Sequence, residues 1–292
     1  MSGVPSIRLM VDDERRHRYP ARMWAGDTIV ELTPDVTVGR SVATVVDGSG
    51  PPATAPEADR ALVSLDVLAG LPPGDGFPFA AGRWVPLLPV DVSADLETAR
   101  QYVAEGAIGT PHVVDLTVPV GLPPSGEWDV DHVTAVSPLE AMVFGIRIAE
   151  FVANAVVVTS SWLSREPSVS TAVHTLDSGV QVVHHIVPAH STPATMFDGV
   201  VLGGSGRLAL RQPFAPGSVG VWSPGPPGYT FPAVREAKHD VQAPDSVVGG
   251  WELAALLSEL VAPGARAVRL GEDATRLVRH AVRQFPGGND DH

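Results

Sequence analysis

The sequence contains no cysteine and a single lysine, Lys238. Without cysteine there is no disulfide and no thiolate metal site, so nothing points to secretion. No apolar run is long enough to cross a bilayer. The first residues, MSGVPSIRLMVDDERRHRYP, lack the basic-then-apolar order of a signal peptide, and we therefore expect a cytoplasmic protein.

Negative charge dominates the chain. The formal net charge is −13, which argues against nucleic acid as a partner because phosphate binding needs a basic surface. Hydrophobic residues make up 44% of the 292 residues and charged residues 18%, which is typical of a globular protein with one large or two modest domains. Abundant Ala, Gly, Pro and Val, with arginine in place of lysine, suggest a GC-rich actinobacterial source.

The most informative stretch runs from Ser93 to Pro119. Ser93 is a suitable N-cap, carboxylates fill the first turn that follows, and apolar residues recur at helical spacing. Gly106 should end this helix, since glycine readily takes the left-handed conformation after a C-cap. A strand is then predicted from His112 to Val118.

The residues before this stretch predict a small sheet. Strands are expected at Ile7–Val11, Thr28–Leu32 and Ser41–Val46. Between them and Ser93 the pattern is ambiguous: a helix over Pro56–Leu65 and a strand over Val63–Leu68 are alternatives.

The residues after it give a clearer pattern. Ser137, Pro138 and Glu140 form a capping box at the start of a helix whose apolar face should lie on a sheet. Five strands are predicted next, with a hairpin at Asp177–Gly179 and another at the Gly203–Gly206 cluster. The predicted strands are Ala155–Trp162, Ser170–Leu176, Val180–Val187, Val200–Leu202 and Leu208–Arg211. Two closing helices are predicted at Val247–Val261 and Asp273–Phe285, followed by a disordered tail over 286–292.

Four sequence segments, in this order along the chain, resemble segments of the Gfo/Idh/MocA family of NAD(P)-dependent oxidoreductases: EGAIGTPHVVDLTV, SPLEAMVFGIRIAEFV, VLGGSGRLAL and LGEDATRLVRHAVRQF. The resemblance covers about two thirds of the chain. It implies an α/β (α+β) fold with a reduced, degenerate Rossmann-like domain over 1–92. A second domain over 93–285 would hold an open, largely antiparallel sheet with helices on one face.

The sequence lacks each of the three motifs that members of that family use for redox chemistry. The family pattern has a glycine fingerprint after the first strand, but here Asp12, Asp13 and Glu14 follow. It also has a Glu-Lys-Pro lysine closing the first domain, and Lys238 comes too late to match. Val133 and Ser137 stand where its Asp-x-x-x-His pair is expected. We therefore predict no cofactor, with NAD(P) as the alternative.

The remaining candidates for acid–base chemistry are histidines and their carboxylate neighbours. Asp129, Asp131 and His132 precede a helix, where a carboxylate–imidazole pair can act as general base or acid, or can simply cap and solvate a loop. His184 is a second catalytic candidate, and the hairpin places His174 near it on one face, although lone strand histidines are more often core residues. Predicted substrate-binding residues are Trp84, His174, Trp222 and Tyr229. No metal site is predicted.

Three functions stay open at this point. The first is a non-redox enzyme, such as a cyclase, isomerase, dehydratase or lyase, acting on a hydrophobic small molecule of secondary metabolism. The second is a non-catalytic partner of an active paralogue, and the third a divergent NAD(P)-dependent oxidoreductase. Some predicted strands carry apolar residues on both faces of the sheet, so both faces should be covered. Because helices are expected on one face only, we predict that the open face is buried in a homo-oligomer, most simply a dimer.

Overall fold

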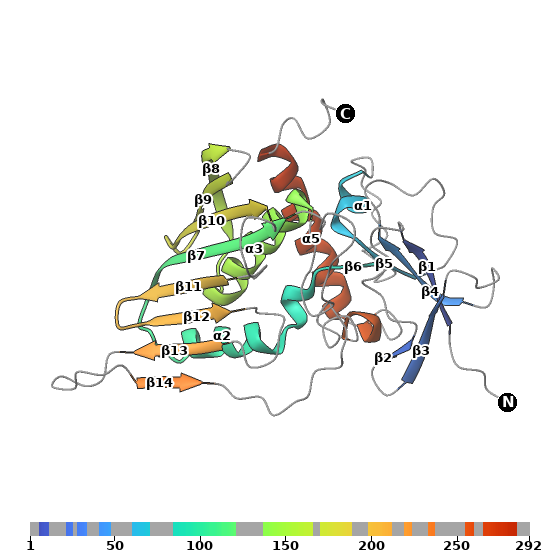
Figure 1. The fold of residues 1–292 in the computed structure, drawn as a ribbon, viewed down its shortest axis with the longest axis horizontal. Helices are drawn as coiled ribbons and strands as arrows, with labels where there is room; N and C mark the ends of the chain where they lie inside the picture. The colour runs from blue at the N-terminus through green and yellow to red at the C-terminus, as the bar shows by residue number, and fades with distance from the viewer. Residues whose placement is uncertain are drawn as a thin grey trace. The chain divides into compact units, whose positions relative to one another are not determined.

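The computed structural model describes residues 6–11, 22–25, 28–33, 41–47, 60–70, 84–120, 137–165, 170–188, 198–211, 219–223, 233–236, 255–259 and 265–284. They fall into two compact units (Figure 1). The first comprises Met1–Pro89 with Asp245–His292, and the second comprises Val90–Pro244. Within the described residues, no helix is both long and apolar enough to span a membrane.

The first unit contains a six-stranded sheet in the order β2-β3-β1-β4-β5-β6. β1 lies between β3 and β4 and runs parallel to both, whereas β2 pairs antiparallel with β3 at the edge. This mostly parallel sheet confirms the Rossmann-like expectation. The strands are β1 (Ser6–Val11), β2 (Arg22–Ala25), β3 (Thr28–Thr33), β4 (Ser41–Asp47), β5 (Ala61–Val63) and β6 (Trp84–Pro86).

The ambiguous segment before Ser93 is resolved differently from both predicted alternatives. A short strand, β5, is followed at once by the short helix α1 (Leu65–Ala69). Ser64 separates them as an N-cap, its hydroxyl accepting a hydrogen bond from the amide of Val67 at 3.5 Å. Both predictions were wrong here because the apolar run continues through both elements, so its periodicity does not mark the boundary at Ser64.

The long C-terminal helix, α5 (Ala265–Gln284), groups with the first unit. It packs against β6 and α1. The sequence placed this helix in the second domain, over 93–285, and the structure corrects that division. The reason is that an amphipathic helix reveals its apolar face but not which sheet that face covers. Residues 255–259, inside the other predicted closing helix, are also helical.

The second unit contains an eight-stranded sheet in the order β14-β13-β12-β11-β7-β10-β9-β8. Only the pairing of β7 with β10 is parallel, so the predicted largely antiparallel sheet is confirmed. The strands are β7 (Pro111–Val120), β8 (Val157–Arg165), β9 (Ser170–Leu176), β10 (Gln181–Pro188), β11 (Asp198–Gly203), β12 (Arg207–Arg211), β13 (Val219–Ser223) and β14 (Ala233–Glu236).

Two helices cover one face of this sheet: α3 (Pro138–Ala153) contacts β7 and β10, and α2 (Ala94–Ala104) contacts α3, β12 and β13 (Figure 1). Both begin as the sequence predicts. Ser93 caps α2, and the capping box of Ser137 and Glu140 caps α3. Gly106 follows the end of α2 with a φ of +74°, as expected. Between β6 and α2 lies a short 3-10 helix, Pro89–Val92.

Two of the segments that carry the family resemblance, EGAIGTP and LGGSGRL, pack against each other. The amide of Ser205 donates to the carbonyl of Ile108 at 2.9 Å, and that of Gly204 to the carbonyl of Thr110 at 3.0 Å. A Cβ at Gly203 would lie 2.2 Å from the Ile108 oxygen, so the close approach requires glycine there. The hairpin between β11 and β12 therefore anchors the turn that leads from α2 into β7.

Candidate functional site

The structure describes only part of the predicted site. Asp129, Asp131, His132 and Tyr229 lie outside the described residues, and for Trp222 only its backbone place on β13 is described. Trp84 is half-buried on β6 of the first unit. The roles predicted for these six residues stay predictions.

His174 and His184 come together as the hairpin register predicts. His174 pairs with Val182, and His184 pairs with Ala172, so the two imidazoles are diagonal neighbours on the helix-covered face. Their ring centroids are 5.8 Å apart. Ser160 of β8 contacts the pair from the other side, its Oγ lying 2.6 Å from His174 Nδ1.

Both imidazoles are buried under the helix layer, with exposed fractions of 1% for His174 and 0% for His184. Among the residues that the structure describes, neither ring nitrogen of His184 has a hydrogen-bond partner. Burial, with additional repulsion from His174 and His185, lowers the pKa of His184 well below its ordinary value of 6.5, so the ring is neutral. A group without solvent contact does not meet a substrate from solution. We therefore correct the catalytic role predicted for His184 and the substrate contact predicted for His174: both are core residues.

The opposite, open face of the same sheet carries a polar cluster that the sequence reasoning did not select. His185 alternates with His184 and so points to this face. Its Nδ1 lies 3.0 Å from Thr171 Oγ1 on β9, and its Nε2 lies 3.5 Å from Asp115 Oδ1 on β7. Strand alternation at the His184–His185 pair was the signal available, because it assigns one imidazole to each face.

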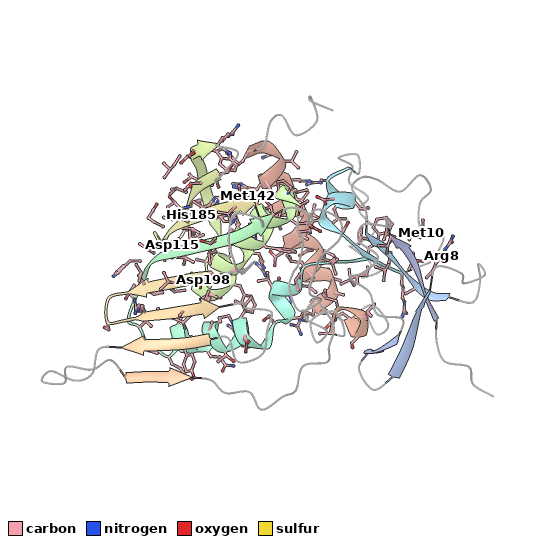
Figure 2. All side chains as sticks on the ribbon, in the orientation of Figure 1. Arg8, Met10, Asp115, Met142, His185 and Asp198 are labelled. Atoms are coloured by element: carbon pink, nitrogen blue, oxygen red, sulfur yellow. The ribbon has the colours of Figure 1, made fainter. Side chains whose placement is uncertain are left out.

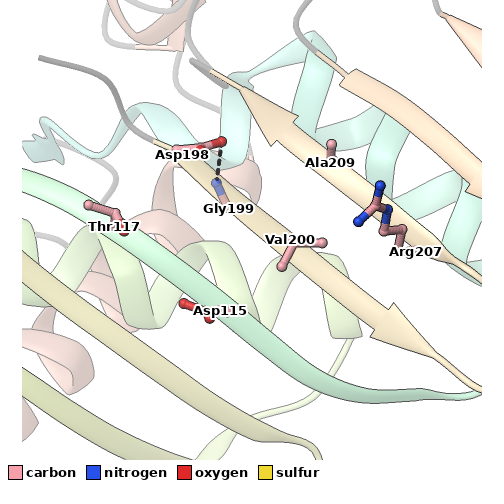
Figure 3. A pocket seen from close by; sticks show the side chains of 7 residues that line it. All are labelled: Asp115, Thr117, Asp198, Gly199, Val200, Arg207 and Ala209. Atoms are coloured by element: carbon pink, nitrogen blue, oxygen red, sulfur yellow. Dashed lines mark hydrogen bonds between the residues drawn. The ribbon is translucent and has the colours of Figure 1, made fainter. Parts of the chain in front are cut away.

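Beside this cluster the open face holds a cavity of about 360 Å³, which we call the open-face cavity. β7 contributes Asp115 and Thr117 on one side of β11, and β12 contributes Arg207 on the other (Figure 3). Figure 2 shows Asp115, His185 and Asp198 on neighbouring strands of the sheet. The complete lining comprises Asp115, Thr117, Asp198, Gly199, Val200, Arg207 and Ala209.

The open-face cavity can bind polar groups, but its residues do not make a metal centre. Among the residues that the structure describes, no group of three or more His, Asp or Glu side chains is arranged to hold a metal ion. The carboxylates instead offer hydrogen-bond acceptors and negative charge, and the guanidinium offers donors and positive charge.

Neither a family model nor a curated protein matches the chain. Solved structures do. An aldose-aldose oxidoreductase from Caulobacter crescentus matches with a TM-score of 0.62 at 10% identity, covering 96% of this chain and 97% of that one. The fold is that of the Gfo/Idh/MocA oxidoreductases.

Further matches have the same fold with different named functions. A levoglucosan dehydrogenase, solved with NADH and levoglucosan, matches with a TM-score of 0.60 at 8% identity over 96% of each chain. A super-repressor mutant of Gal80p from Saccharomyces cerevisiae matches with a TM-score of 0.56 at 12% identity, covering 87% of this chain and 81% of that one. The resemblance read from the sequence is confirmed at the level of the fold.

The Gfo/Idh/MocA fold implies a dinucleotide at the first unit, and the residues there do not fit one. In doubly wound sheets a dinucleotide binds beyond the carboxyl end of the first strand, where glycines let the backbone approach the pyrophosphate. β1 has the matching central position, parallel to β3 and β4. The next residues are Asp12, Asp13 and Glu14, and the first glycine after β1 is Gly26, beyond β2. Carboxylates at this point would repel a pyrophosphate.

Proposed function

We propose that this protein is an enzyme of the Gfo/Idh/MocA fold that acts on a small molecule without a bound nicotinamide. The reaction class is a non-redox one, such as a cyclisation, isomerisation, dehydration or lyase step, on a hydrophobic substrate of bacterial secondary metabolism in the cytoplasm. The observation that carries the proposal is the carboxylate-rich, glycine-free sequence directly after β1, the strand at the centre of the parallel sheet.

The lysine content supports the same proposal. The family resemblance implies a lysine, in a Glu-Lys-Pro motif that closes the first domain, among the groups used for redox chemistry. The only lysine here is Lys238, in the numbering range of the second unit. A chain without that amine needs another acid–base group, and Asp129, Asp131 and His132 remain the proposed ones.

Calorimetric titration with NADH and NADPH tests the proposal. We expect no measurable heat of binding with either nucleotide. Levoglucosan dehydrogenase, which was solved with NADH, is the positive control under the same conditions. Micromolar binding of either nucleotide would instead identify a divergent NAD(P)-dependent oxidoreductase, in which Arg15, Arg16 and Arg18 are the first arginines after β1 in the sequence.

The alternative is a non-catalytic partner that binds an active paralogue, and the match to Gal80p is relevant because that protein is named for repression and not for a reaction. Purification of the protein from its native host separates the two functions. A stable heteromer whose activity survives His132→Ala in this chain would support the partner function. Loss of activity with His132→Ala, while the heteromer stays intact, would support the enzyme.

We also propose that two copies associate through the open face of the eight-stranded sheet. Val158 and Leu163 lie at the two register irregularities of the edge strand β8 and are 57% and 69% exposed, so this edge offers apolar surface to a second copy. Light scattering after size-exclusion chromatography measures the mass. A dimer that dissociates on Leu163→Asp supports the association, and a monomeric mass at all protein concentrations contradicts it.

A further inference from the structure

The open face of the eight-stranded sheet carries a histidine beside a carboxylate on two neighbouring inner strands. His185 lies on β10 and Asp115 on β7 (Figure 2). His185 Nε2 lies 3.5 Å from Asp115 Oδ1, and its Nδ1 lies 3.0 Å from Thr171 Oγ1 on β9. We call these three residues the open-face cluster. A second copy that covers this face, as proposed above, also covers the cluster.

Small side chains surround the open-face cluster. The register places Thr117 and Thr171 directly beside His185, and it places Val183 directly beside Asp115. The half-buried Thr and Val side chains that share this face are Val113, Thr117, Thr171, Val173, Thr175, Val183 and Val200. None of them is long enough to fold over the cluster, so a second copy can approach it closely.

Asp115 relies on His185 for a positive partner. Among the described residues of β7, β9 and β10, His185 is the only side chain on this face that can carry a positive charge. The next charged residues on the face are Asp198 on β11, and Arg207 and Arg211 on β12. Asp198 lies opposite Arg211 in the register, and Arg207 has an interaction of its own.

Both charge states of the imidazole keep their hydrogen bonds. The Thr171 hydroxyl can donate to Nδ1 of the neutral ring or accept from Nδ1–H of the charged ring. Nε2–H can donate to the Asp115 carboxylate in both states. The two states therefore differ in charge and not in the number of hydrogen bonds: the neutral ring leaves the carboxylate uncompensated, and the charged ring completes an ion pair.

A second copy makes that difference larger. Removing an uncompensated carboxylate from water costs more than removing a hydrogen-bonded ion pair. Burial alone would disfavour the imidazolium, but Asp115 is desolvated in both charge states and is neutralised in only one. Asp198, on the same face, also favours the charged ring. Association should therefore take up a proton at His185 of each copy.

We propose that pH controls the association of two copies through the open face, with His185 and Asp115 as the sensing pair. Protonation of His185 strengthens the association. Thr171 is a positioning residue, since it acts through the imidazole that it holds. This inference rests on the association proposed above and adds its regulation.

The dissociation constant of the dimer tests the proposal. Mass photometry at nanomolar and light scattering at micromolar protein concentration measure it at about pH 8 and about pH 6, on either side of the range where histidine changes charge. We expect a value at least about tenfold lower at the acid pH. The upper limit is about a hundredfold per pH unit, for one proton taken up by each copy.

Variants identify the sensing pair. His185→Gln keeps a polar side chain that cannot be protonated, so its dissociation constant should change less than about threefold between the two pH values. Asp115→Asn removes the carboxylate, and the strengthening in acid should be lost. His112→Gln, at an exposed histidine of β7 outside the cluster, is the matched control and should keep the full dependence. Amide spectra that match the native protein show that each variant is folded.

The outcomes separate the regulation from the association. A dimer with one dissociation constant at both pH values would overturn the regulation and leave the association intact. A strengthening in acid that persists in His185→Gln would also overturn it, and would assign the effect to the net charge of −13 as a whole. A monomeric mass at both pH values would overturn the association and this inference together.

Discussion

The imidazole of His184 fills the space that a side chain at Gly145 would need. A Cβ built on Gly145 in α3 would lie 2.2 Å from His184 Cε1 and 2.3 Å from its Nε2. His184 is fully buried, so the ring cannot turn out into solvent to make room. The closeness of α3 to β10 therefore depends on a glycine in the middle of a helix, where glycine is otherwise unfavourable.

Gly145→Ala should destabilise the protein. Helix propensity alone predicts a gain of up to about 1 kcal/mol. The clash with a buried ring should outweigh it and give a net loss of about 1–3 kcal/mol in the free energy of unfolding, measured by urea denaturation. In the double variant Gly145→Ala, His184→Ala the clash is relieved, so the loss should be smaller than the sum of the two single losses. A Gly145→Ala protein more stable than the native one would contradict the packing described.

The free energy of unfolding should decrease as the pH is lowered, because of His184. Burial lowers the pKa of this imidazole, so in acid the unfolded chain takes up a proton that the folded chain does not. The stability is complete above the ordinary pKa of 6.5 and is lost as the pH falls below it, by about 1.4 kcal/mol per pH unit for this one group.

Urea denaturation between about pH 7.5 and pH 5.5 measures that dependence. His184→Leu should remove this part of the slope, whereas His112→Gln, at an exposed histidine of β7, should keep it. The same slope in both variants would show that His184 is accessible to protons in the folded state.

Ser160→Ala should weaken the sheet beneath α3. Ser160 Oγ lies 2.6 Å from His174 Nδ1, and His174 is 1% exposed. Loss of this hydroxyl removes a hydrogen bond from a buried imidazole, with an expected cost of about 1–3 kcal/mol in the free energy of unfolding. Ser160→Thr keeps the hydroxyl and is the control. Equal stability of Ser160→Ala and the native protein would rule out an energetic role for this contact.

Arg147→Met should be strongly destabilising. Arg147 Nε donates to an Asp91 carboxylate oxygen at 2.9 Å, and Nη1 donates to Glu150 at 3.3 Å. The side chains of Arg147, Asp91 and Glu150 are only 14%, 10% and 1% exposed. Removal of the cation leaves two carboxylates in a largely dry environment, and we expect a loss of about 3–5 kcal/mol.

The matched control for Arg147 is Arg100→Met. Arg100 pairs with Glu97, but these side chains are 37% and 40% exposed, so the expected loss is under about 1 kcal/mol. Thermal and urea denaturation of both variants give the comparison. Similar losses in the two would mean that burial does not decide the strength of these ion pairs.

The sequence predicted those parts of the fold that depend on local chemistry. The N-caps at Ser93 and Ser137, the stop at Gly106 and the hairpin at Asp177–Gly179 all rest on interactions between residues a few positions apart, and the structure confirms them. The neighbouring positions of His174 and His184 followed from the hairpin register in the same way.

Features that depend on distant packing could not be predicted in this way. The burial of His184 depends on Gly145, which is far from it in sequence, and strand alternation gave no sign that a helix would lie so close. The cluster of Thr171, His185 and Asp115 draws on three strands whose order the sequence did not specify. The unit to which α5 belongs depends on contacts with β6 and α1, not on its own amphipathic pattern.

The grouping of α5 with the N-terminal strands has a consequence for biosynthesis. The unit Val90–Pro244 is continuous, so all of its residues are available once the ribosome has released residue 244. The N-terminal sheet, although translated earlier, lacks the helix that packs on β6 until Ala265–Gln284 has emerged. Domains usually mature in the order of their translation. Here the later-encoded unit can be completed first, and the face of β6 that α5 covers stays without that helix until the end of synthesis.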